Sequence, residues 1–207
     1  MTRIVSSWED YCSVEPVSRE TVTALRVYER LLREWSSKLN IVAPKTLTDV
    51  WLRHFADSLQ LRKLTHQAKV LIDIGSGGGF PGLPLAISAI GSGGVFHLVE
   101  SDQRKCAFLR AVALETGAKV EIHAARVEEL TGKLPVPDVL TARALASLET
   151  LLAIAEPYLL SGSICVFPKG RDYARELTSV GHRDNYVIET HESLTSSESK
   201  IFTVRAV

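Results

Sequence analysis

The stretch Val70-Leu71-Ile72-Asp73-Ile74, followed directly by Gly75-Ser76-Gly77-Gly78-Gly79-Phe80-Pro81-Gly82, decides the fold of this 207-residue chain. The first five residues form a short apolar run that is typical of a buried strand. Five glycines within the next eight residues permit a tight turn and let a ligand approach the backbone closely. Residues 81–87 can open a helix, because proline is tolerated in a first turn. The order of strand, glycine loop and helix is typical of a domain that binds a nucleotide or nucleoside.

The alternation of strand and helix continues beyond this stretch. We expect strands at 95–100, 119–124, 138–142 and 163–167, and helices at 102–115, 127–130, 147–160 and 173–179. Two further strands, at 185–190 and 200–205, have no helix between them and predict an antiparallel hairpin at one edge of the sheet. The pattern predicts an α/β fold with a doubly wound, mostly parallel, Rossmann-like sheet.

Residues 1–66 read as a helical extension packed on this core. Apolar residues recur every three or four positions from Ser18 to Leu39, which predicts one amphipathic helix. Pro44 interrupts the pattern, and a second, shorter helix is expected from the N-cap Asp49 to Leu59. We therefore expect two parts, the helical extension at 1–66 and the α/β domain at 67–207.

Two cofactor classes fit the glycine loop. A dinucleotide requires G-x-G-x-x-G, which Gly77 to Gly82 matches, with its pyrophosphate at the helix N-terminus. Pro81 and Pro84 lack the N–H donors that a pyrophosphate needs, whereas S-adenosylmethionine carries no phosphate. The acid Glu100 ends the second strand and can accept hydrogen bonds from ribose hydroxyls, which both cofactors have. The cofactor residues expected on these grounds are Asp73, which suits the sulfonium and amino end, Gly77, Gly79 and Glu100.

Five motifs occur in a fixed order along the chain. They are Arg53-His54-Phe55-Ala56-Asp57-Ser58-Leu59, the loop 73–84, Ala125-Arg126-Val127-Glu128-Glu129, residues 141–148, and Pro168-Lys169-Gly170. With them the chain resembles the RsmG (GidB) family of bacterial small-subunit rRNA guanine-N7 methyltransferases. The resemblance implies S-adenosylmethionine as cofactor, 16S rRNA or the small ribosomal subunit as partner, and a methyltransferase domain at 67–207. It further implies cofactor contacts at Gly75, Phe80, Val127, Glu128 and Arg143.

Methyl transfer from a sulfonium is an in-line displacement, so the enzyme mainly positions donor and acceptor. Guanine N7 has a free lone pair at neutral pH and needs no general base. Our hypothesis is that Arg143 or Lys169 is the catalytic residue that contacts guanine O6 or a neighbouring phosphate and leaves N7 free. Carbon-5 methylation would need a nucleophilic cysteine, and Cys165 lies inside an apolar strand.

Other functions stay open at this point. A methyltransferase for another RNA site or a small molecule fits the same fold, as does a nucleotide-binding regulatory module without chemistry. An NAD-dependent dehydrogenase is disfavoured by the two prolines and by the lack of a second domain. For His54 and Asp57, which share a helix face, hydrogen bonds that anchor the N-terminal helices are favoured over substrate contacts.

Charge and composition limit the partners. The chain has 24 Lys and Arg against 24 Asp and Glu, so an RNA-binding surface must come from local clustering. We expect acids on the far side of the molecule and a basic face around the cofactor site, formed by Lys45, Arg53, Arg104, Lys105, Lys169 and Arg171. No apolar run reaches the roughly 18 residues of a membrane span, and no secretory signal is recognisable. We expect a cytoplasmic monomer that binds no membrane.

No metal site is expected either. The three cysteines lie far apart and form no metal-binding pair. The histidines show no ligand spacing along the sequence; they are His54, His66, His97, His123, His182 and His191.

Overall fold

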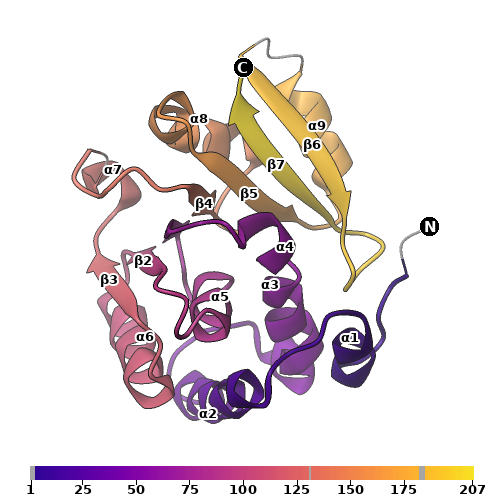
Figure 1. Cartoon of the computed structure of the whole chain (residues 1–207), viewed down its shortest axis with the longest axis vertical. Coiled ribbons are helices and arrows are strands. Elements are labelled where there is room, and N and C mark those ends of the chain that lie inside the picture. The colour runs from indigo at the N-terminus through magenta and orange to yellow at the C-terminus, as the bar shows by residue number, and fades with distance from the viewer. Residues whose placement is uncertain (1–2, 131, 182–184) are drawn as a thin grey trace.

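The computed structural model describes residues 3–130, 132–181 and 185–207. Its centre is a seven-stranded sheet in the order β3-β2-β1-β4-β5-β7-β6 (Figure 1). The strands are β1 Val70–Ile74, β2 Val95–Glu100, β3 Val120–Ala124, β4 Val139–Thr141, β5 Ile164–Lys169, β6 Tyr186–Glu192 and β7 Lys200–Ala206. Strands β1 to β5 pair in parallel, while β7 runs antiparallel to both β5 and β6. The predicted α/β sheet with an antiparallel hairpin at one edge is therefore confirmed.

Strand order reverses between β1 and β4, the point at which ligands bind in sheets of this kind. The helices that follow the strands are α5 Gly82–Ser88, α6 Gln103–Thr116, α7 Val127–Leu130, α8 Leu148–Leu160 and α9 Tyr173–Val180. Side chains cap the N-termini of α6 and α8: Asp102 accepts the N–H of Arg104 at 2.8 Å, and Ser147 accepts that of Thr150 at 3.3 Å. Helix α6 ends at Gly117, which has a φ of 72°.

Each face of the sheet has its own hydrophobic core. Helices α2, α5 and α6 cover one face, where Leu71 of β1 packs, and α8 covers the other, where Ile72 and Ile74 pack (Figure 1). Asp73 alternates with these residues and so points to the α5 side, beneath the glycine loop.

The N-terminal segment contributes to the first of these cores. Its elements are α1 Trp8–Val14, α2 Arg19–Ser36, η1 Pro44–Asp49, η2 Trp51–Ala56, α3 Asp57–Leu59 and α4 Arg62–Thr65. Tyr28 of α2 is fully buried, stacks on the ring of Phe80 with 5.3 Å between centroids, and donates a hydrogen bond to the carbonyl of Gly78. The helical extension thus supports the back of the glycine loop.

The expectation of one regular helix from Asp49 to Leu59 is wrong. Pro44 opens a 3₁₀ helix, Asp49 is its last residue rather than an N-cap, and a π-helix and a single α-turn follow. Helices α1 and α4 were not expected, since neither spans more than 7 residues and periodicity is weak over such lengths. Among the described residues, no helix has the length and apolar character that crossing a membrane requires.

Candidate cofactor and substrate site

Two cavities lie side by side at the carboxyl ends of the parallel strands. The first, about 510 Å³, is called the loop pocket because residues of the glycine loop line it, together with segments that include Glu100, Lys105, 125–128 and His54. The second, about 920 Å³, is called the hairpin pocket because residues 193–201 of the β6–β7 hairpin line it, together with Asp57, 168–172 and Glu176. The two pockets share one wall, residues 143–146 after β4.

The glycine loop requires glycine for two reasons: its backbone conformation and the lack of room for a side chain. Gly75 and Gly77 have φ values of 64° and 56°, in the left-handed region. A Cβ on Gly75 would lie 2.5 Å from Cδ1 of Leu145, across the loop pocket. The loop is therefore a close-fitting cradle of backbone against the shared wall.

Most of the expected cofactor residues come together in the loop pocket. Those that line it are Gly75, Gly77, Phe80, Glu100, Val127, Glu128 and Arg143. Asp73 and Gly79 do not line it: Asp73 is fully buried, and a Cβ on Gly79 would meet the hydroxyl of Tyr28 at 2.5 Å. Both residues support the loop from behind.

Glu100 is fixed by two backbone donors. Its Oε2 accepts the N–H of Gly77 at 2.8 Å, and its Oε1 accepts the N–H of Asp102 at 2.8 Å. The carboxylate at the end of β2 thereby sets the position of the glycine loop after β1. Each oxygen retains a further lone pair for a ligand hydroxyl.

Asp73 lies beneath the loop. Its Oδ1 accepts the hydroxyl of Thr141 at 2.8 Å, and its Oδ2 accepts the N–H of Gly82 at 3.3 Å. Burial raises the pKa of this carboxyl from 3.8 to about 6, against the lowering effect of these hydrogen bonds. Asp73 therefore ties the start of α5 to β1 and β4.

Arg143 joins the two pockets. Its Nε lies 3.3 Å from Oδ2 of Asp57, and its Nη2 donates to the carbonyl of Arg53 at 2.9 Å. The guanidinium also lies over the ring of Phe80, 5.8 Å from its centroid. Its Nη1 is buried and has no hydrogen-bond partner among the residues that the structure describes. The side chain is held on one side and retains a free donor on the other.

His54 helps to hold Arg143. Burial, and then the charges of Arg143 and Arg53, lower the pKa of this imidazole from 6.5 to about 3, so it is neutral at physiological pH. Arg143 Nη2 lies 3.2 Å from its Nδ1, which must accept, because guanidinium is only a donor. The remaining N–H on Nε2 then donates to the hydroxyl of Thr46 at 2.9 Å. Its ring stacks on Phe80 at 4.6 Å between centroids.

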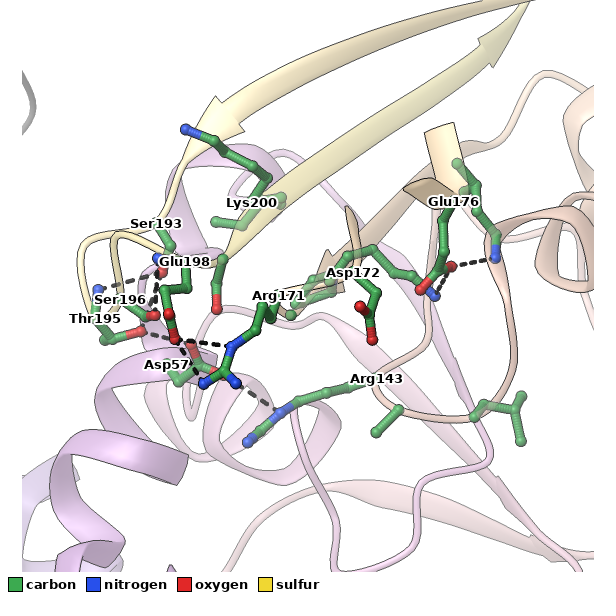
Figure 2. A pocket seen from close by; sticks show the side chains of 18 of the residues that line it. Asp57, Arg143, Arg171, Asp172, Glu176, Ser193, Thr195, Ser196, Glu198 and Lys200 are labelled. Atoms are coloured by element: carbon green, nitrogen blue, oxygen red, sulfur yellow. Dashed lines mark hydrogen bonds and ion pairs between the residues drawn. The ribbon is translucent and has the colours of Figure 1, made fainter. Parts of the chain in front are cut away.

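Asp57 connects distant parts of the chain. Besides Arg143 it accepts the hydroxyl of Thr195 at 2.7 Å and the side-chain amide of Gln60 at 2.9 Å. Figure 2 shows Asp57 and Arg143 facing each other, with Thr195 of the hairpin loop beside them. The hydrogen bonds of His54 and Asp57 confirm the expected anchoring of the N-terminal helices. The part played by Thr195 was missed, since the sequence shows only a polar loop there.

Lys169 lies in the hairpin pocket, at the end of β5. Its Nζ is 2.6 Å from Oε2 of Glu176 and donates to the carbonyl of Ala146 at 2.8 Å. The same Glu176 oxygen accepts the N–H of Leu148 at 2.6 Å. In Figure 2, Glu176 lies at the opposite end of the pocket from Asp57. The ammonium is therefore occupied by Glu176 of α9 and by the shared wall, and Glu176 links it to the start of α8.

The expectation that basic and acidic side chains lie on opposite sides of the molecule is wrong. Acidic side chains line the hairpin pocket beside the basic ones, and most of the expected basic residues have an acidic neighbour. Arg53 lies 3.9 Å from Asp49, Arg171 lies 3.0 Å from Glu198, and Arg104 lies 3.1 Å from Asp102. Pairing of this kind lowers the repulsion among like charges that one basic face would create.

The fold and this site define the class of protein. A mostly parallel sheet that ends in β5-β7-β6, with a glycine loop after β1 and an acid after β2, is a Rossmann-like methyltransferase fold. The SAH-bound methyltransferase PaMTH1 of Podospora anserina shares it at a TM-score of 0.64 with 10% identity, over 96% of this chain and 93% of that chain. The ribosomal protein L11 methylase of Lactobacillus delbrueckii shares it at a TM-score of 0.58 with 14% identity, over 77% of this chain and 79% of that chain.

Sequence similarity identifies the family. Residues 21–202 match the model of the rRNA small subunit methyltransferase G (GidB) family, and the chain belongs to this family. The ribosomal RNA small subunit methyltransferase G of Rhodospirillum centenum is 50% identical, over 88% of this chain and 82% of its own length. That of Methylorubrum populi is 47% identical, over 92% of this chain and 91% of its own length. The resemblance seen in the sequence is confirmed.

Proposed function

We propose that this chain transfers a methyl group from S-adenosylmethionine to N7 of a guanine in 16S rRNA of the small ribosomal subunit. One observation carries the proposal: two pockets of different character share the wall at residues 143–146. A cofactor in the loop pocket and a nucleotide in the hairpin pocket would meet at this wall. Membership of the family supports small-subunit rRNA as the substrate.

The residues of the loop pocket fit the cofactor. S-Adenosylmethionine supplies a methyl group activated by its sulfonium. Glu100 would accept the ribose hydroxyls, and Val127 and Glu128 would hold the adenine beyond β3. Leu145 of the shared wall packs against the backbone of Gly75, with no room for a Cβ between them. Pro81 and Pro84 at the start of α5 disfavour a pyrophosphate there.

The acceptor requires orientation rather than activation. The N7 lone pair is available at neutral pH, so no side chain has to remove a proton. Arg143 is held by Asp57 and His54, and its buried Nη1 is the donor we assign to guanine O6 or an adjacent phosphate. Lys169 holds the carbonyl of Ala146 directly and pairs with Glu176, which holds the N–H of Leu148, so it would act by positioning the shared wall.

The surroundings of the reaction follow from the same proposal. We place the activity in the cytoplasm, where the small subunit is assembled, and assign it to a monomer with a helical extension at 1–66 and a methyltransferase domain at 67–207. The mixed charges of the hairpin pocket favour contacts with a few phosphates over a broad basic surface.

The test is methyl transfer from radiolabelled S-adenosylmethionine to small ribosomal subunits that lack N7 methylation. Nucleoside analysis should find the label as 7-methylguanosine in 16S rRNA. Subunits already methylated at N7 are the matched control and should take up no label. Cofactor binding without incorporation into rRNA would contradict the proposal and favour a small-molecule acceptor.

A further inference from the structure

Three metal-ligating side chains meet on one face of strands β2 and β3, outside both pockets. His97 stands opposite Glu121 in the register of the two strands, and His123 lies two residues further along β3. One ligand atom from each lies within 4.8 Å of the others. His97 Nδ1 is 3.0 Å from Nε2 of His123 and 3.4 Å from Oε2 of Glu121. Residue spacing along the chain does not indicate this cluster, because strand pairing brings its members together.

The single Nδ1 of His97 faces both the imidazole of His123 and the carboxylate of Glu121. If His97 Nδ1 carries hydrogen, it can donate to the imidazole of His123 or to the carboxylate of Glu121, and one acceptor is left over. If it carries a lone pair, the carboxylate faces that lone pair at 3.4 Å. The other ring nitrogen of His97 is buried and has no hydrogen-bond partner within the described residues. All polar interactions of this imidazole therefore depend on its Nδ1.

A divalent cation resolves the conflict, since each group then directs a lone pair at it. Ligand atoms at about 2.0–2.1 Å in a tetrahedron are roughly 3.3 Å apart. The two separations at His97 Nδ1, 3.0 and 3.4 Å, lie on either side of that value. Two imidazoles with one carboxylate select a transition metal over calcium or magnesium.

We propose that His97, Glu121 and His123 bind a divalent transition-metal ion, with zinc as the chief candidate and water as the fourth ligand. The side chain of Glu121 is 64% exposed, which leaves that fourth position open to solvent. The ion would clamp the edge strand β3 to β2. His123 stands two residues before Ala125, where the 125–128 wall of the loop pocket begins, so the clamp would fix this wall.

The site is tested by titrating the full chain, free of any affinity tag and stripped of metal with a chelator, with Co²⁺. One equivalent should produce the strong visible absorption of a tetrahedral complex, and Zn²⁺ should abolish it by displacement. His123→Ala, a partly exposed position, should weaken binding at least about tenfold. His191→Ala is the matched control, because His191 is also a strand histidine but bonds to Thr203 at 2.9 Å. It should leave binding unchanged.

Thermal unfolding gives a second readout that does not depend on activity. Zinc at about a hundred times its Kd should raise the Tm of the wild type by about 5 to 10 °C, and that of the His123→Ala variant much less. The proposal is overturned if no saturable Co²⁺ absorption appears, if the absorption is the weak one of a six-coordinate ion, or if His123→Ala binds as the wild type does.

Discussion

The loop pocket and the hairpin pocket differ in how the chain builds them. Segments that directly follow β1, β2 and β3 line much of the loop pocket, where the carboxylate of Glu100 holds the N–H of Gly77. The hairpin pocket is held by side chains from distant segments, such as Asp57 with Arg143 and Thr195. The proposed cofactor side thus depends largely on local sequence, and the proposed acceptor side depends on tertiary structure.

The largest effect is expected at Arg143, where the two pockets meet. Arg143→Met removes the buried donor Nη1 and leaves the loop pocket otherwise intact. Loss of one positioned donor costs about 100- to 1000-fold in rate, so kcat/KM for rRNA methylation should fall by that factor. Calorimetry should find cofactor affinity reduced far less. Steady-state kinetics with ribosomal subunits measure the first quantity.

Arg175→Met is the control for this change. Arg175 lines the same hairpin pocket from α9 and is exposed. Its loss should lower kcat/KM much less than the loss of Arg143. Equal losses in the two variants would mean that Arg143 contributes only charge. An unchanged rate in Arg143→Met would remove it from the site.

A smaller effect is expected at Asp73, beneath the glycine loop, and it depends on pH. The pKa of this buried carboxyl is raised from 3.8 to about 6, so the folded state takes up a proton before the unfolded state does. The free energy of unfolding should therefore rise as pH falls from 7 to 4, relative to Asp73→Asn. Between pH 7 and pH 4, the difference in unfolding free energy between the two proteins should change by about 2 kcal/mol. Urea denaturation at both pH values measures it.

Asp138 provides a control of opposite sign. Backbone N–H groups of Val70 and Lys69 lower its pKa in the folded state. Its contribution to stability should therefore be lost as pH falls through that lowered pKa. Comparison with Asp138→Asn should show this opposite trend. A difference between wild type and Asp73→Asn that does not change with pH would show that the pKa of Asp73 is not raised in the folded state.

A substitution at Gly75 tests the loop pocket in the same way. In Gly75→Ala the left-handed φ of 64° is strained, and the new Cβ lies 2.5 Å from Leu145. Cofactor affinity should fall by about tenfold or more, because the new Cβ would displace Leu145 of the shared wall. Calorimetric titration with S-adenosylmethionine gives the Kd.

Gly91→Ala separates strain from contact. Gly91 has a φ of 90° and no atom within 4 Å of its Cβ position, and it lines neither pocket. The Gly91→Ala variant should be less stable, because the residue is strained, but it should retain its affinity for the cofactor. If both variants bind the cofactor normally, the glycine loop does not form the cofactor site.

Local patterns were sufficient to predict the sheet and the loop pocket. Buried strands such as 70–74 are continuous apolar runs, and the segments that follow them line the pocket by virtue of the fold. The irregular helix at 44–59 was mispredicted, because tertiary contacts such as the stacking of His54 on Phe80 override its own helical periodicity.

Which side chains pair with one another at the hairpin pocket could not be predicted from the sequence. Arg143 pairs with Asp57, which is distant in the sequence, while the nearer acid Asp138 accepts the N–H groups of Lys69 and Val70. The cluster of His97, Glu121 and His123 was missed for the same reason. Contacts between strands follow from register, which spacing along one segment does not contain.

The smallest effect tests whether the hairpin pocket depends on its long-range ion pair. Asp57→Asn removes the charge opposite Arg143 but keeps an oxygen for Thr195 and Gln60, so unfolding should cost about 1 kcal/mol less. Asp49→Asn removes an exposed partner of Arg53 at 3.9 Å and should change stability by less than about 0.3 kcal/mol. Urea denaturation of the two variants measures the difference. Equal values would mean that the Asp57–Arg143 pair is no stronger than a surface contact, and that the hairpin pocket owes its shape to the backbone, as the loop pocket does.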